Sequence, residues 1–171
     1  MLSDAQGQLL VGAVVAAFIG FSIEGLPAII HVPLALLVGG LAGALYGFIP
    51  GALKAYTGAH EVIVTIMLNY VAINLTDWLA DGPLKDPSPT NIVARTPKIF
   101  PSAELPVIGN IPTGFILALI AAVVVWWVLY RTTLGYEERT GGLNSSEAQY
   151  AGIRVARTLI LTMMIAGLLA G

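Results

Sequence analysis

The sequence predicts an all-α integral membrane protein: a polytopic helical bundle of four complete transmembrane helices plus a truncated fifth. Two observations predict this class. Hydrophobic residues make up 57% of the 171 residues and charged residues only 11%, whereas soluble domains carry about 25% charged residues. The apolar residues also gather in long uncharged stretches. A soluble chain of this size could not cover so much apolar surface with polar groups.

The apolar stretches are long enough to be membrane spans, because a transmembrane helix needs about 20 mostly apolar residues. Four such stretches follow one another: between Asp4 and Glu24, over residues 25–53, over 62–80 and over 105–130. A fifth begins after Arg157 and stops at residue 171. At about 1.5 Å per residue it is too short to cross a hydrocarbon layer of about 30 Å. We therefore expect a truncated chain with an incomplete fifth helix.

Two polar segments separate the spans. Residues 81–110 contain six prolines, and proline disfavours regular helix, so we expect an extra-membrane loop there. Residues 131–157 carry four arginines, and short arginine-rich loops stay on the cytoplasmic side. Lys54, which follows the second span, falls on the same side. We thus expect one transmembrane domain over 1–171, with a Pro-rich loop at 81–110 that is extracellular and a cytoplasmic loop at 131–157.

Glycines recur at every fourth position of the second span, at Gly39, Gly43, Gly47 and Gly51. This spacing places all four on one helix face. A face without side chains lets another helix approach closely, which is how membrane helices pack without a hydrophobic driving force. The pattern predicts tight helix packing, either inside one subunit or at a subunit interface.

Polar side chains inside the spans are the candidates for a solute pathway. A polar group in hydrocarbon costs free energy unless it is paired or faces water. Asn69 sits deepest in the third span and is the first candidate. The alternative is that Asn69 makes a hydrogen bond between helices.

Several kinds of chemistry are missing from the sequence. It has no cysteine, which excludes a disulfide framework or a thiolate metal site. His60 and Glu61 open like the zinc motif HExxH, but position 64 is Val, so no metal or cofactor site is predicted. No phosphate-binding loop is present, so the chain is not expected to be an enzyme, and an ATP-driven function would need a separate ATPase. The net charge of −2 gives no sign of a nucleic-acid partner.

Residues 142–153 are the most informative polar segment. Asn144 is a good N-cap and Glu147 follows three residues later, as in a capping box. Gly152 is a plausible helix stop. We therefore expect a short amphipathic helix of about two turns between two spans. Such a helix either docks a soluble partner or anchors the loop at the membrane surface.

Three stretches carry a family resemblance. They are residues 7–13, residues 58–70 and the set of 132–136, 142–144, 147–148 and 150–153. The last set resembles the coupling loop of the permease subunits of ABC importers, and the second is similar to a stretch of the simple-sugar and nucleoside branch, especially its nucleoside members. Together the three stretches occur in the order of that family.

The resemblance implies a permease subunit in the cytoplasmic membrane that moves a nucleoside or a simple sugar. It implies ATP-binding cassette ATPase subunits docked on the coupling helix through Asn144, Glu147, Tyr150 and Gly152. It also implies a second permease subunit, in a homo- or heterodimer, and an extracellular solute-binding protein. Asn69 is then the best pathway residue, and Gln6 and Asn74 are weaker candidates.

The alternative is a secondary transporter or channel subunit without an ATPase partner. That class uses discontinuous helices and polar residues at membrane depth. It also predicts charged residues deep in the spans for ion coupling. The spans contain almost none, which favours the permease reading.

Overall fold

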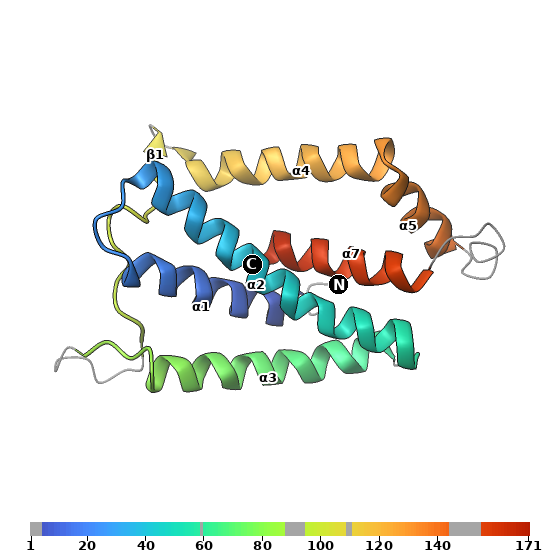
Figure 1. Ribbon diagram of the computed structural model, residues 1–171, viewed down its shortest axis with the longest axis horizontal. Helices are drawn as coiled ribbons and strands as arrows, with labels where there is room; N and C mark the ends of the chain where they lie inside the picture. Colours follow the sequence, from blue (N-terminus) through green and yellow to red (C-terminus); the bar gives the residue numbers. More distant parts are fainter. Residues whose placement is uncertain (1–4, 59, 88–94, 109–110, 144–154) are drawn as a thin grey trace.

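The computed structural model describes residues 5–58, 60–87, 95–108, 111–143 and 155–171. Within these ranges the chain forms six helices: α1 (Gln6–Ser22), α2 (Ala28–Thr57), α3 (Glu61–Asp81), α4 (Thr113–Arg131), α5 (Thr133–Leu143) and α7 (Val155–Ala170). Two short antiparallel strands, β1 (Val107–Ile108) and β2 (Ile111–Pro112), precede α4. The apolar helices share one general direction and the connections gather at the two ends of the bundle (Figure 1).

Three helices are long and apolar enough to cross a membrane: α2, α4 and the segment Val62–Asp81 of α3. The helices α1 and α7 are apolar but shorter, with 17 and 16 residues. The 30 residues of α2 extend about 45 Å, which exceeds the thickness of the hydrocarbon layer. Figure 1 shows α2 lying obliquely to its neighbours, and tilt is the usual way for a long span to fit. The expected helical membrane architecture is confirmed at this level.

Prolines and glycines set the helix boundaries. Helix α2 follows Pro27 and ends at Gly58, whose φ of +64° is left-handed and whose N–H donates to the Lys54 carbonyl at 3.2 Å. Helix α4 begins at Thr113, eight residues later than the apolar stretch that starts at residue 105. Pro106 and Pro112 lack N–H donors, and Val107–Ile108 pairs with Ile111–Pro112 as the strands β1 and β2 instead. The Thr113 hydroxyl donates to the Pro106 carbonyl at 2.7 Å and holds the start of α4.

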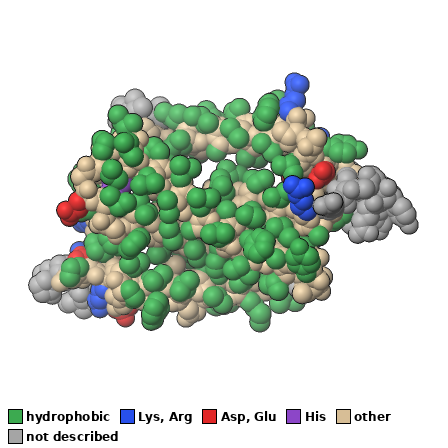
Figure 2. All heavy atoms as spheres, in the orientation of Figure 1, with side chains coloured by type: hydrophobic (Ala, Val, Ile, Leu, Met, Phe, Trp, Pro, Cys, Tyr) green, Lys and Arg blue, Asp and Glu red, His purple; other side chains and the backbone are tan. Residues whose placement is uncertain are grey.

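Helix α2 is the centre of the bundle, because it packs against both α7 and α1, and α1 packs in turn against α3. Helix α4 is placed differently. It packs against α5 and β2, and none of its residues is buried. Figure 2 shows open space between α4 and the rest of the bundle. The described chain therefore has a packed four-helix body and one largely uncovered apolar helix.

Charged residues lie at the two ends of the molecule, and apolar side chains cover the length between them (Figure 2). One end holds the C-terminal ends of α2 and α4, all of α5 and the start of α7 (Figure 1). The opposite end holds the segment after α3, in which Lys85 pairs with Asp81 at 2.9 Å and Arg95 with Asp86 at 3.6 Å. Between these ends, the described helices present an apolar surface suited to lipid.

Candidate functional site

Three helices bring polar side chains together inside the bundle. Gln8 of α1, Tyr46 of α2, and Thr65 and Asn69 of α3 line a small cavity, with Pro50 and Leu68 completing its wall. We call these four polar residues the polar junction. Gln8, Thr65 and Asn69 are buried, with 4%, 3% and 8% of their surfaces exposed. The cavity has a volume of about 10 Å³, so it cannot admit a sugar or a nucleoside as it stands.

Asn69 holds the start of α1. Its Oδ1 accepts a hydrogen bond from the Gly7 N–H at 2.7 Å. Gly7 is the second residue of α1, so its N–H has no acceptor within the helix. A Cβ at Gly7 would lie 2.8 Å from Asn69 Oδ1 and 3.0 Å from the Tyr46 ring, which explains the glycine. The structure thus gives Asn69 an interhelical bond, and its place on a solute pathway stays a prediction.

Two hydroxyls of the polar junction bond to α3 backbone. The Tyr46 hydroxyl donates to the Leu68 carbonyl at 2.6 Å, and the Thr65 hydroxyl donates to the Val62 carbonyl at 3.1 Å. The first bond joins α2 to α3, as the Asn69 bond joins α3 to α1. These bonds fix three helices relative to one another through polar contacts that lipid cannot replace.

The other two pathway candidates lie elsewhere. Gln6 is exposed at the first position of α1. Asn74 is exposed on α3, and its Nδ2 donates to the Tyr70 carbonyl of its own helix at 2.8 Å. Gln8, which was not among the candidates, is the glutamine that the structure buries. Its spacing of four from Gly12 places the two residues on one face of α1, and that spacing is the signal that could have found it.

The glycines Gly39, Gly43, Gly47 and Gly51, here called the glycine seam, face α7 and α1 of the same chain. A Cβ at Gly47 would lie 2.5 Å from the Met163 carbonyl oxygen, and one at Gly51 would lie 3.2 Å from Ile160 Cα. A Cβ at Gly43 would collide with the backbone of Gly167. A Cβ at Gly39 would lie 3.0 Å from the Gly12 carbonyl oxygen. Sequence reasoning missed Gly167 of α7 and Gly171, which directly follows α7 and repeats the four-residue spacing.

His31 fastens the Pro-rich segment to the helix ends. Its side chain is fully buried, with Nδ1 at 2.9 Å from Ser102 Oγ and Nε2 at 3.1 Å from the Ile19 carbonyl oxygen. Because a carbonyl oxygen only accepts, Nε2 donates to Ile19, whereas the hydroxyl of Ser102 can donate or accept at Nδ1. The Phe100 N–H also donates to the Gly20 carbonyl at 2.9 Å. Sequence reasoning missed this contact, because the partners of His31 lie far along the chain.

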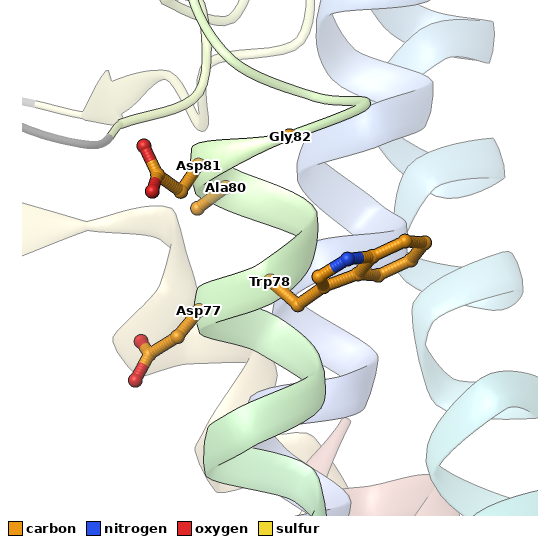
Figure 3. A pocket seen from close by; sticks show the side chains of 5 residues that line it. All are labelled: Asp77, Trp78, Ala80, Asp81 and Gly82. Carbon is orange, nitrogen blue, oxygen red and sulfur yellow. The ribbon is translucent and has the colours of Figure 1, made fainter.

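The end of α3 forms a shallow pocket of about 440 Å³ lined by Asp77, Trp78, Ala80, Asp81 and Gly82. Figure 3 shows the two carboxylates on one side of the helix and the indole on the other. Asp81 is paired with Lys85. Within the described ranges, no three His, Asp or Glu side chains gather as a metal site would require.

Helix α5 occupies part of the segment that was expected to be a loop. The Thr158 hydroxyl of α7 donates to Glu137 Oε2 at 3.0 Å, and the Arg139 guanidinium lies 5.0 Å from the centre of the Tyr130 ring of α4. These contacts tie α5 to both neighbouring helices. The four coupling candidates, Asn144, Glu147, Tyr150 and Gly152, lie outside the described residues.

Comparisons with known proteins agree on one family. Residues 5–171 match the family described as "Branched-chain amino acid transport system / permease component". Over 174 residues, 97% of this chain and 48% of the relative, the chain is 42% identical to the guanosine ABC transporter permease protein NupP of Bacillus subtilis. It is 36% identical to the nucleoside ABC transporter permease protein NupB of Lactococcus lactis, over 96% of this chain and 48% of that protein.

A third relative is a glucose ABC transporter permease protein of Haloferax volcanii, which is 29% identical over 97% of this chain and 46% of its own length. The chain thus spans about half the length of the curated relatives it matches. No solved structure matches the chain.

Proposed function

The chain belongs to the family of the permease component of the branched-chain amino acid transport system, and from this membership we propose that it forms membrane-spanning helices of an ABC importer for a nucleoside or a simple sugar. The observation that carries the proposal is the family match over residues 5–171. The relatives are permease proteins of guanosine, nucleoside and glucose ABC transporters, and they supply the solute class. In this role the chain is not itself an enzyme.

We further propose that α1 crosses the membrane as α2, α3 and α4 do, and that α7 is part of a fifth span. The end of the bundle that holds α5 faces the cytoplasm, and the Pro-rich segment 81–110 faces outside. Basic residues support this orientation, because Lys54, Arg131, Arg139 and Arg157 belong to elements at the proposed cytoplasmic end. Positive charge is retained on that side during insertion.

Asn69 is the proposed pathway residue, with Gln6 and Asn74 as weaker candidates. Support for Asn69 comes from its position in the polar junction, where polar groups of three helices meet. The cavity there is too small for a solute, so a pathway at this point requires the helices to separate during transport. A shift between two access states, driven by ligands that bind one state more tightly, would provide that separation.

The partners are proposals of the same kind. ATPase subunits dock on the cytoplasmic segment through Asn144, Glu147, Tyr150 and Gly152. A second permease subunit, identical or not, completes the pathway, and an extracellular binding protein delivers the solute. Helix α5 supports a coupling role for the adjoining segment, because its contacts with Thr158 and Tyr130 would carry a displacement to α7 and α4.

A chimeric transporter tests the function. Residues 5–171 replace the aligned segment of the guanosine permease of Bacillus subtilis, in a strain that lacks the native protein, and uptake of radiolabelled guanosine is measured. We expect uptake that depends on the ATPase subunit. The Glu147→Arg substitution should abolish it by reversing a charge at the proposed docking helix.

Glu104→Arg is the matched control, because it reverses a charge on an exposed residue of the opposite segment and should leave uptake intact. Membrane insertion of each chimera is verified by fractionation. An inserted chimera that transports nothing, or one that transports equally well with Glu147→Arg, would contradict the proposal.

A further inference from the structure

Gln8 carries a buried polar atom that the protein does not satisfy. Within the described part of the chain, its Oε1 is the buried side-chain oxygen or nitrogen without a hydrogen-bond partner. The residue is 4% exposed and lines the cavity of the polar junction. A buried carbonyl oxygen without a donor costs free energy, and a membrane interior offers no solvent to supply one. The surroundings of Gln8 should therefore contain a donor.

Tyr46 presents a second acceptor beside Gln8. Its hydroxyl has given its proton to the Leu68 carbonyl and keeps lone pairs that can accept. The lining also holds the side-chain amides of Gln8 and Asn69, whose nitrogens are donors. A ligand that fits beside Gln8 must therefore be able both to donate and to accept hydrogen bonds.

The backbone of α2 adds another acceptor at the same place. Pro50 lies inside α2 and lines the cavity. It has no N–H to donate to the carbonyl four residues earlier, which is that of Tyr46. The cavity thus sits where α2 lacks one of its own hydrogen bonds. Waters commonly satisfy backbone groups that proline frees in membrane helices.

Size selects the ligand. The cavity measures about 10 Å³, close to the volume of about 10–15 Å³ that the centre of one water molecule requires. A monovalent cation would also fit, but a buried charge needs a compensating partner, and the lining contains no carboxylate. We propose that the polar junction binds one water molecule, which donates to Gln8 Oε1 and to an oxygen of Tyr46 and so bridges α1 to α2.

Solid-state NMR with polarisation transfer from water tests this site on the whole chain in lipid nanodiscs. Threonine and asparagine are labelled, and transfer to Thr65 and Asn69 is compared with transfer to Thr76. Thr76 is the matched control, because it is equally buried on α3 and bonds to its own helix but does not line the cavity. We expect early transfer to Thr65 and Asn69 and none to Thr76. Gln8→Leu, which removes the acceptor, should abolish the transfer.

Transfer to Thr65 and Asn69 no stronger than to Thr76 would overturn the proposal. This comparison within the native chain stands even if the Gln8→Leu chain fails to fold. The melting temperature is also measured in sodium chloride and in choline chloride at equal ionic strength. A water site predicts equal values, whereas stabilisation specific to sodium would show that the ligand is a cation. Neither result depends on transport, so the site is tested separately from the proposed function.

Discussion

At the residue scale, Asn69 shows how one side chain can complete a helix that belongs to another part of the chain. Its Oδ1 supplies the acceptor that the first turn of α1 lacks at Gly7. The bond joins residues 62 positions apart and is buried. The side chain therefore has a structural role whether or not solute passes it.

Replacing Asn69 with Leu should destabilise the chain. The substitution keeps a similar volume but leaves the Gly7 N–H buried and unpaired, which costs about 1–3 kcal/mol. Thermal unfolding followed by tryptophan fluorescence in detergent measures the effect. Asn74→Leu is the control on the same helix: its side chain is exposed and bonds only to Tyr70, so its melting temperature should change little. Equal losses in both variants would contradict the assigned role.

Gly43 is the residue where backbone proximity is most restrictive in the glycine seam. A Cβ there would meet the carbonyl of Gly167, which is backbone and cannot rotate away. Gly43→Ala should therefore lower stability by about 1–3 kcal/mol through overpacking.

Gly114→Ala provides the opposite case in the same unfolding assay. A Cβ at Gly114 would lie 3.6 Å from a Leu105 methyl group, an ordinary contact, and Ala is favoured over Gly in a helix by about 0.5–1 kcal/mol. The Gly114→Ala chain should match or exceed the native melting temperature. A harmless Gly43→Ala substitution would mean that α2 and α7 are not in close contact.

At the element scale, the segment after α3 is attached through α1 and α2. His31 bonds to Ser102 and to the Ile19 carbonyl, Phe100 bonds to Gly20, and a Cβ at Gly20 would lie 2.8 Å from Ile99 Cγ2. A short stretch of the segment is therefore held at several points. Its opening should require these contacts to break together.

Tryptic cleavage after Lys98 reports that opening. Lys98 is exposed. The peptide bond that trypsin would cut joins Lys98 to Ile99, and Ile99 packs on Gly20. His31→Ala removes two hydrogen bonds and leaves a void, so cleavage at Lys98 should accelerate by about tenfold, equivalent to about 1.4 kcal/mol. Ser102→Ala removes one bond and should have a smaller effect. Unchanged cleavage in His31→Ala would show that His31 does not hold the segment.

At the scale of the whole molecule, α4 stands apart from the packed body. Its apolar side chains, including Phe115, Leu119, Trp126 and Trp127, are exposed, and among the described elements it packs mainly against α5 and β2. In water such a surface would drive aggregation. In a membrane it contacts lipid or further helices without that cost.

Brominated lipids measure whether α4 lies in the bilayer. The chain has three tryptophans. The Trp78→Phe substitution removes one of them and leaves Trp126 and Trp127. Both lie in the last two turns of α4, so bromines near the headgroups should quench their fluorescence more strongly than bromines near the acyl-chain ends. Fluorescence that no brominated lipid quenches would show that α4 does not span the bilayer.

The composition and the apolar stretches determined the class of this protein, because only lipid tolerates so apolar an exterior. They also located several helices to within a few residues, as for the span expected over 62–80, which the structure shows as Glu61–Asp81. The start of α4 was misplaced because apolar residues 105–112 are compatible with a hairpin as well as with a span. Helix α5 was missed because its polar sequence has no apolar period to reveal it.

The tertiary structure decided which polar residues meet. Local spacing identified Asn69 and the glycine seam as notable, but not their partners Gly7, Gly12 and Gly167, which lie on other helices. The sequence also favoured Gln6 over Gln8 as a pathway residue, because burial depends on the neighbouring helices and not on the residue type. Helix formation is a local property that hydrogen bonds within one segment satisfy, whereas a polar junction forms only where separate helices supply complementary groups, so its composition emerges only when the helices are packed.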